Sequence, residues 1–396
     1  MASAVIVAIL LAVDKIKGAR AIPTFTTPPY THRPDTSAAQ CVDYTVPITV
    51  TSENLIFDVG PFASSLDVAD LVGNAAAKDS NVTFHPVIGK ENITATYDIA
   101  GTFCSPKTLK GNGREKTVLL ATHGIHYDGR YWDSAFQPEQ YSFVEHAVNA
   151  GFSVFFYDRV GTGRSEKVSG YTNQAAPQVE IIAQLATLLR KGTLSSSIGT
   201  PNSLVLVGHS FGSFTSGQIL ARYPSLADAA VLTGVAYAQP DFASKVIVEA
   251  FAPRVASQLL PEKFADLDSG YLTFADIYAH VNTFFKAPAY DVEAVKYAHS
   301  IVAPFGIAEL FSLGTLNPVA PEFEGPVLVT TGAIDFAMCL GTCESTYAEQ
   351  RLDILFPKVE MLETYLHPGV GHGINLGRNA TGFYDVIVDF LGRAGF

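Results

Sequence analysis

The stretch Leu204-Val205-Leu206-Val207-Gly208-His209-Ser210-Phe211-Gly212 determines how the rest of this chain is interpreted. Its four leading apolar residues are typical of a strand that is buried on both faces. That strand runs directly into the pattern G-x-S-x-G and then into a predicted helix that begins with small residues. A serine at such a sharp strand-to-helix turn presents its hydroxyl, and the tight turn requires small residues on both sides. The stretch therefore predicts that Ser210 is a nucleophile.

The segments around Ser210 predict a mostly parallel sheet. Short apolar runs that suit buried strands alternate with longer stretches that suit helices. The predicted strands are 117–121, 152–157, 204–207, 229–232, 327–330 and 362–366, and the predicted helices include 179–190, 213–223 and 384–391. Two earlier segments, 42–50 and 93–99, alternate apolar and polar residues as half-buried antiparallel strands do. The expected fold class is α/β, with a doubly wound sheet.

The alternation of strands and helices is interrupted by residues 237–320, which are dense in Phe and Tyr and follow a helical pattern. A segment of this length is too long for an ordinary loop. We therefore expect a helical lid at 237–320, inserted into a core made of residues 22–236 and 321–396. The alternative is that the sheet and its helices simply continue through this segment.

Two further motifs carry a resemblance to a known family. A strand ends in His-Gly at Leu119-Leu120-Ala121-Thr122-His123-Gly124-Ile125, and the turn Asp158-Arg159-Val160-Gly161-Thr162-Gly163-Arg164-Ser165 follows the next strand. Together with the segment around Ser210, these motifs resemble the serine-nucleophile α/β-hydrolase family over roughly residues 90–396. The resemblance implies an oxyanion hole formed by the backbone N–H of Phe211 and one from the Gly124–Ile125 segment. It also implies that His123 and His209 orient the backbone, while His126 either reaches the substrate or lies on a surface loop.

The family's chain order of serine, acid and histidine implies the two remaining catalytic residues. The acid should follow the first strand after the lid, where Asp335 stands; Asp241, after the preceding strand, is the alternative. The base should follow the next strand, and His372 matches the family's Gly-His ahead of the final helix. The other histidine there, His367, lies closer to the strand, and we expect it to be structural.

The resemblance implies hydrolysis through an acyl-enzyme on Ser210, without a metal or an organic cofactor. The aromatic lid favours a small-molecule carboxylic ester or lactone with an apolar or aromatic group. An amide-cleaving enzyme similar to the proline-aminopeptidases is the alternative, in which Glu249, Glu262 or Glu293 of the lid would hold an amino terminus. A non-hydrolytic lyase, transferase or binding role in the same fold is the third possibility.

The first residues and the charge balance predict the compartment. An apolar run at 4–13 precedes the small-x-small pattern Ala19-Arg20-Ala21, which predicts a secretory signal peptide at 1–21. Three N-x-[ST] sequons, at Asn81, Asn92 and Asn379, agree with secretion. The net charge of −12 argues against nucleic acid and against an anionic membrane surface as partners. No internal run reaches the roughly 18 apolar residues that a membrane anchor needs. We therefore expect a secreted protein.

The four cysteines are expected to form disulfides in that compartment. Four cysteines allow three pairings. Cys41 and Cys104 flank the first two predicted strands, which an antiparallel pairing would bring together, and Cys339 and Cys343 enclose a short loop. These positions favour the disulfides Cys41–Cys104 and Cys339–Cys343 over the other pairings.

Overall fold

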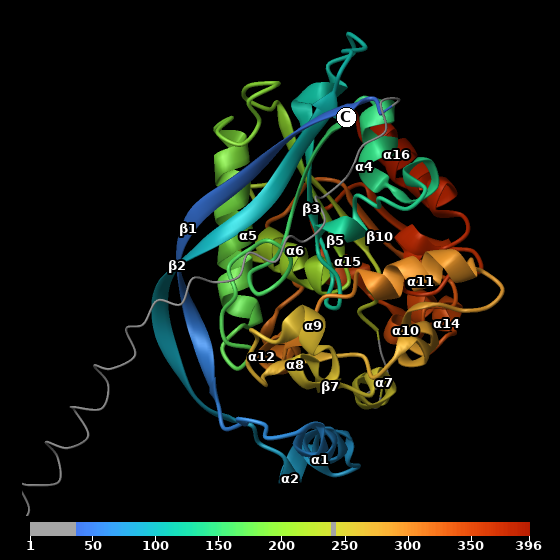
Figure 1. The fold of residues 1–396 in the computed structure, drawn as a ribbon. Helices are drawn as coiled ribbons and strands as arrows, with labels where there is room; N and C mark the ends of the chain where they lie inside the picture. Colours follow the sequence, from blue (N-terminus) through green and yellow to red (C-terminus); the bar gives the residue numbers. More distant parts are fainter. Residues whose placement is uncertain (1–36, 239–242) are drawn as a thin grey trace, which may run out of the picture. The chain divides into compact units, whose positions relative to one another are not determined.

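An eight-stranded sheet forms the centre of the computed structural model, which describes residues 37–238 and 243–396 (Figure 1). The strand order is β1-β2-β4-β3-β5-β6-β10-β11. β1 pairs antiparallel with β2, and β2 pairs antiparallel with β4, whereas all pairs from β4 onward are parallel. The strands of this sheet are β1 (Ala39–Phe57), β2 (Val87–Pro106), β3 (Thr117–Thr122), β4 (Ser153–Tyr157), β5 (Ser203–His209), β6 (Ala229–Thr233), β10 (Val327–Gly332) and β11 (Leu362–His367). The predicted mostly parallel α/β sheet is confirmed.

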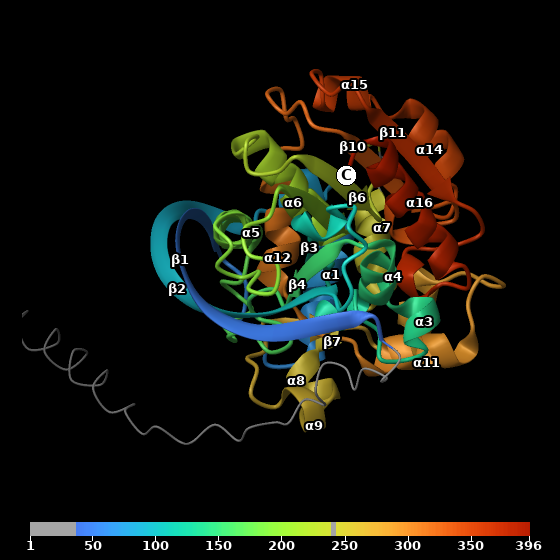
Figure 2. The ribbon, with the colours of Figure 1, turned by 90° about the horizontal axis from the view of Figure 1, so that it is seen from above.

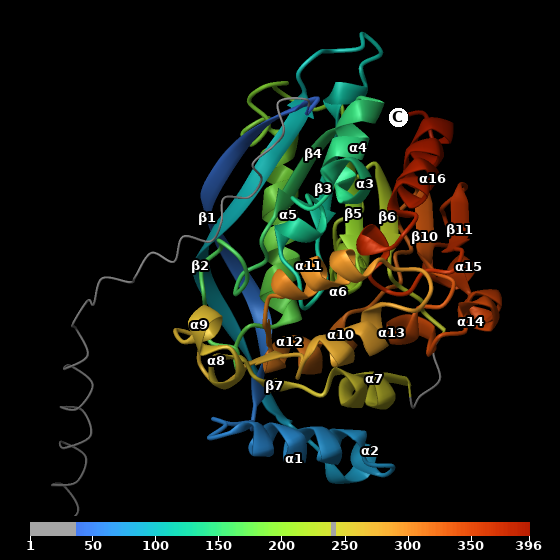
Figure 3. The same cartoon turned by 45° about the vertical axis from the view of Figure 1, so that its right-hand side comes forward.

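Helices cover both faces of this sheet, which explains why its central strands are apolar throughout. Helices α4 and α16 pack together on one face, and α5 and α6 pack together on the other (Figure 3). The helices are α1 (Ser65–Ala76), α2 (Ser80–Thr83), α3 (Pro138–Tyr141), α4 (Phe143–Ala150), α5 (Ala175–Arg190), α6 (Phe211–Arg222), α7 (Ala243–Phe251), α8 (Ala256–Leu259), α9 (Pro261–Phe264), α10 (Ile277–Phe284), α11 (Val292–Ser300), α12 (Ile307–Ser312), α13 (Phe336–Cys339), α14 (Cys343–Glu349), α15 (Leu352–Leu355) and α16 (Ala380–Arg393). Short 3-10 helices are η1 (Arg114–Lys116), η2 (Gly129–Tyr131), η3 (Leu313–Thr315) and η4 (Ile374–Leu376).

Residues 237–320, called the inserted segment below, leave the sheet after β6 and return to it at β10. This segment contains helices, as its sequence pattern predicts, but it is not helical throughout. Besides α7 to α12, it contains a three-stranded sheet of β7 (Arg254–Val255), β8 (Tyr271–Thr273) and β9 (Phe305–Gly306). Both pairs in this small sheet are antiparallel. Strands of two or three residues are too short to show an alternating pattern, so the sequence could not indicate them.

The first two strands form a ribbon that is much longer than the predicted segments 42–50 and 93–99. β1 has 19 residues and β2 has 20, and they pair from Ala39↔Pro106 to Phe57↔Val87. Figure 2 shows the ribbon curving around α5. β2 pairs with β4 only through Gly101 to Cys104, so most of the ribbon extends beyond the sheet.

The end of this ribbon carries α1 and α2, and we call residues 58–86 the hairpin head. Helix α1 begins with a capping box, in which the Ser64 hydroxyl accepts from the Leu66 N–H and the Asp67 carboxylate accepts from the Ser64 N–H. The expected domain division placed these residues in the core. In the structure, α1 packs against α7 of the inserted segment (Figure 3).

The cysteines form the two disulfides that their positions favour, Cys41–Cys104 and Cys339–Cys343. Cys41 lies directly opposite Cys104 in the β1–β2 register, so the first disulfide joins neighbouring strands. Within residues 37–238 and 243–396, no helix is long and apolar enough to cross a membrane. The predicted signal peptide at 1–21 and the alternative acid Asp241 lie outside the described residues.

Candidate active site

Ser210 occupies the turn between β5 and α6, as the motif predicts. Its backbone has φ 53° and ψ −120°, a left-handed conformation that is strained for any residue other than glycine. The Ser210 N–H donates to the Thr233 carbonyl, at the end of β6, at 2.9 Å. The turn is tight because a Cβ on Gly212 would lie only 2.1 Å from the Thr122 carbonyl oxygen. Both the strain and the close approach fix where the Ser210 hydroxyl points.

Asp335 and His372 form a buried pair at the same edge of the sheet. Asp335 follows β10 and caps α13, where one of its carboxylate oxygens accepts from the Met338 N–H at 2.9 Å. The other oxygen accepts from the Thr331 hydroxyl at 2.5 Å and from His372 Nδ1 at 2.7 Å. The two side chains of the pair are 0% and 1% exposed. This arrangement leaves His372 Nε2 as the nitrogen that can accept a proton.

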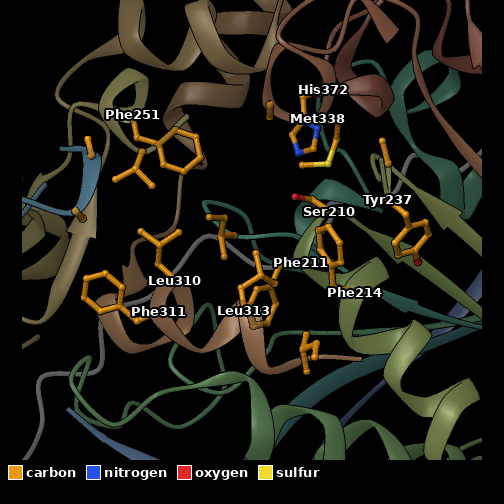
Figure 4. Close-up of a pocket in the computed structure, with 18 of the residues that line it drawn as sticks. Ser210, Phe211, Phe214, Tyr237, Phe251, Leu310, Phe311, Leu313, Met338 and His372 are labelled. Carbon is orange, nitrogen blue, oxygen red and sulfur yellow. The ribbon is translucent and has the colours of Figure 1, made fainter. Parts of the chain in front are cut away.

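His372 and Ser210 line one cavity, and Figure 4 shows them on the same side of it. The His209 ring, next to Ser210 in the chain, lies 4.8 Å from the His372 ring between centroids. The structure thus brings together Ser210, Asp335 and His372, which are far apart in the sequence. Because the strands of a parallel sheet all end at one edge, the loops after β5, β10 and β11 meet there.

The Gly124–Ile125 segment, the predicted second part of the oxyanion hole, lies beside Ser210. A Cβ on Gly124 would lie 2.9 Å from the Ser210 Cβ, and Ile125 lines the same cavity. Phe211 is the first residue of α6, so its N–H has no acceptor within the helix. Two backbone segments with N–H groups therefore flank the serine, as an oxyanion hole requires.

Two buried side chains hold the Gly124 carbonyl. His123 Nε2 accepts from the Arg159 N–H at 3.0 Å, so Nδ1 carries the proton and donates to the Gly124 oxygen at 2.8 Å. Burial and then the nearby Arg159 charge lower the pKa of His123 to about 3, which keeps the imidazole neutral. The Arg159 guanidinium also donates to the Gly124 oxygen, at 3.3 Å. The expectation that His123 orients the backbone is confirmed.

The cavity in front of Ser210 has a volume of about 680 Å³ and an apolar wall. Among the described residues that line it, only Ser210, Tyr237 and His372 have polar side chains, and none is a carboxylate, lysine or arginine. Phe251, Leu310 and Phe311 of the inserted segment contribute much of this wall (Figure 4). Phe284 of the same segment also lines the cavity. A cavity of this size and polarity suits an apolar small molecule.

Other candidate residues lie elsewhere. The buried His367 bonds the Asn379 carbonyl through Nε2 at 3.0 Å, ahead of α16, and does not line the cavity. His126 neither reaches the cavity nor lies on the surface: it is fully buried and stacks on Phe274 at 3.7 Å between centroids. The sequence offered no signal for this position, because the aromatic residues around His126 come from the distant inserted segment.

The carboxylates of Glu249, Glu262 and Glu293 in the inserted segment are exposed and absent from the cavity wall. The sequon residues Asn81, Asn92 and Asn379 are also exposed. Among the described residues, no group of three or more His, Cys, Asp or Glu side chains is placed to hold a metal ion.

Sequence reasoning missed several residues of the site. Thr331 has no motif that links it to Asp335, and the hairpin head supplies Ala75, Ala76, Phe84 and Pro86 to the cavity wall. The capping residues Ser64 and Asp67 could have indicated α1, although not its position at the cavity.

Comparison with known proteins agrees with this geometry. Residues 118–386 match the sequence model of the Alpha/beta hydrolase family. This is more than half of the chain, and the protein belongs to that family. No curated protein sequence matches the chain.

Several solved structures share the fold. A thermophilic esterase from Thermogutta terrifontis is 17% identical, with 76% of this chain and 95% of that chain covered and a TM-score of 0.52. A bromoperoxidase from Bacillus anthracis is 20% identical, with 75% and 96% covered and a TM-score of 0.50. A hydrolase from Pseudomonas aeruginosa is 17% identical, with 74% and 95% covered and a TM-score of 0.50. At these identities the likeness shows the shared fold alone.

Proposed function

We propose that this protein is a serine hydrolase that cleaves carboxylic esters or lactones with an apolar or aromatic group. One observation carries the proposal: Ser210 and His372 line one apolar cavity. Asp335 is hydrogen-bonded to Nδ1 of His372, so the other ring nitrogen, Nε2, is left for Ser210. A serine hydroxyl and an imidazole at one cavity, with a buried carboxylate behind the imidazole, are the parts of a serine triad, and they occur here in the family's chain order.

The geometry supports the following mechanism. Asp335 accepts a hydrogen bond from the protonated Nδ1 of His372, which leaves Nε2 unprotonated and able to take the proton of Ser210. The Ser210 oxygen attacks the ester carbonyl carbon, and the N–H of Phe211 and one from the Gly124–Ile125 segment hold the oxyanion. The tetrahedral intermediate collapses as His372 gives its proton to the leaving alcohol, and an acyl-enzyme forms. Water, deprotonated by His372, then attacks the acyl carbonyl. The bond from the acyl carbon to the Ser210 oxygen breaks, His372 returns its proton to that oxygen, and the acid is released.

The cavity wall favours the hydrolysis of esters over the cleavage of amides by an aminopeptidase mechanism. An aminopeptidase must hold a charged amino terminus, and a buried charge needs a partner of opposite sign. No described residue on the wall is a carboxylate, and Glu249, Glu262 and Glu293 are exposed. We therefore expect hydrolysis of aryl esters and no release of aniline from aminoacyl anilides.

A fluorophosphonate probe tests the proposal directly. The purified protein should form an adduct on the Ser210 peptide, and Ser210→Ala should lose both the adduct and ester hydrolysis. Ser216→Ala is a matched control, because its buried hydroxyl lies further along α6 and has no hydrogen-bond partner among the described residues. Folded protein that is neither labelled nor active on esters would contradict the proposal and favour a lyase, transferase or binding role.

We also propose that the protein is secreted and glycosylated. The exposed sequon residues and the two disulfides support this location. Expression of the full chain in a eukaryotic secretion host should yield extracellular protein whose mass falls on treatment with N-glycosidase. Intracellular protein with four free thiols would contradict it.

A further inference from the structure

The hairpin head is an addition to the sheet that reaches the cavity from outside the core. The β1–β2 ribbon holds it beyond the point where β2 leaves β4, at Gly101. The head has no part in the sheet, in the turn around Ser210 or in the Asp335–His372 pair. Its position therefore calls for a separate explanation.

The head is fixed to the inserted segment by specific contacts. The Val255 N–H donates to the Ser65 hydroxyl at 3.1 Å, and the Gln258 amide donates to the Ala63 carbonyl at 2.9 Å. The Phe84 ring lies 5.8 Å from the Phe311 ring between centroids. These hydrogen bonds join the head to β7 and α8, and α1 also packs against α7. Phe84 lies against a residue of the cavity wall.

The head also forms part of the cavity wall. Ala75 and Ala76, in the last turn of α1, line the cavity, as do Phe84 and Pro86. Figure 4 shows Phe311, the partner of Phe84, on the side of the cavity opposite Ser210 and His372. The two alanines are half-buried, and both have short side chains.

We propose that the hairpin head closes the end of the cavity away from Ser210, and that Ala75 and Ala76 set the length of the acyl chain it accepts. The inference rests on the proposed ester hydrolysis. An acyl chain attached at Ser210 extends along the apolar wall until it meets the head. A larger side chain at position 75 or 76 would occupy the space of the terminal methylenes and leave the carbonyl at Ser210 undisturbed.

The test compares p-nitrophenyl esters with acyl chains from acetyl to dodecanoyl. In Ala76→Phe and Ala75→Phe, kcat/KM for acetyl and butyryl esters should fall much less than kcat/KM for long-chain esters. For decanoyl and dodecanoyl esters it should fall about 10- to 200-fold, the range for excluding even one methylene from an apolar pocket. Asn74→Phe, at an exposed position of the same helix, should leave the whole length profile unchanged. If Ala76→Phe does not fold, Ala76→Leu gives the same test with a smaller change.

Two outcomes would overturn the inference. The first is an unchanged length profile in the variants, and the second is an equal loss of kcat/KM for all lengths, which would mean that the head only supports the fold.

A binding experiment distinguishes a failure of this inference from a failure of the proposed hydrolysis. Saturated fatty acids of the same lengths should displace an apolar fluorescent probe from Ser210→Ala. Ala76→Phe, added to that variant, should weaken displacement by the long acids only. If Ala76→Phe weakens the binding of long acids but the original protein hydrolyses no ester, the proposed limit on acyl-chain length is supported and the serine hydrolase proposal is contradicted.

Discussion

Arg159 and Glu309 form an ion pair in which both side chains are almost completely buried. The pair joins the turn after β4 to α12 of the inserted segment. Arg159 also donates to the Gly124 carbonyl at 3.3 Å, and its guanidinium lies 4.6 Å from the centre of the Phe211 ring. One arginine therefore connects both sides of the proposed oxyanion hole with the wall of the cavity.

Breaking this pair should be costly. Glu309→Gln leaves the Arg159 charge buried without its partner, which typically costs about 3–5 kcal/mol of unfolding free energy. Urea unfolding of the variant and of the original protein measures the difference. Glu293→Gln serves as the control, because the Glu293–Lys296 pair is exposed and should contribute little. Equal losses in the two variants would contradict the importance of the buried pair.

Asp335→Asn should lower kcat by about 10⁴-fold and leave KM nearly unchanged. The amide has the same shape as the carboxylate, but it no longer stabilises the imidazolium or fixes the proton on Nδ1 of His372. Steady-state kinetics on a short aryl ester measure the effect. Asp353→Asn is the control, since Asp353 is exposed and pairs only with Arg351 among the described residues. Comparable kinetics in both variants would show that Asp335 is not part of the triad.

Stability should fall on mild acidification because of buried histidines. Burial, and then neighbouring histidines, lower the pKa of His126, His209 and His280 well below the usual 6.5. Below about pH 6.5 the unfolded chain takes up protons that the folded protein does not, so unfolding is favoured as the pH falls. Each such histidine contributes about 1.4 kcal/mol per pH unit to this slope.

Urea unfolding between pH 7.5 and 5 measures that slope. His126→Asn should reduce the slope of unfolding free energy against pH by the contribution of one histidine. Asparagine is chosen because it tolerates the positive φ of 66° at this position. His85→Asn, at an exposed position, should not change it. A pH-independent stability over this range would contradict the lowered pKa values of the buried rings.

The two disulfides should differ in their effects on stability and activity. Chain-entropy estimates give about 4 kcal/mol for Cys41–Cys104, which closes a separation of 63 residues, and about 2 kcal/mol for Cys339–Cys343, with a separation of 4. The second disulfide, however, lies directly after Asp335 and holds its loop. Replacing Cys41 and Cys104 by Ser should therefore lower Tm more, and replacing Cys339 and Cys343 should lower kcat more. The opposite order in either measurement would contradict this assignment.

The central sheet and the candidate triad could be predicted because their signals are local. Each strand is a short apolar run, and Ser210, Asp335 and His372 each follow such a run in a recognisable loop. Thr331, Arg159 and Glu309 could not be assigned, since their partners lie in distant parts of the sequence. His126 was misplaced for the same reason, because its burial depends on Phe274 and other rings of the inserted segment. The length of β1 and β2 was underestimated because their far ends pair only with each other and need no continuous apolar face.

The position of the hairpin head has a consequence for how proteins of this family diverge. Ala75, Ala76, Phe84 and Pro86 lie before residue 118, outside the segment that matches the family, yet they contribute to the cavity wall. The ribbon leaves the sheet and returns to it, so an exchange or deletion between residues 58 and 86 would not change the order of Ser210, Asp335 and His372. Part of the cavity wall is thus encoded outside the stretch that carries Ser210, Asp335 and His372. Natural variation or loop grafting between residues 58 and 86 could change which substrates the enzyme accepts and leave Ser210, Asp335 and His372 unchanged.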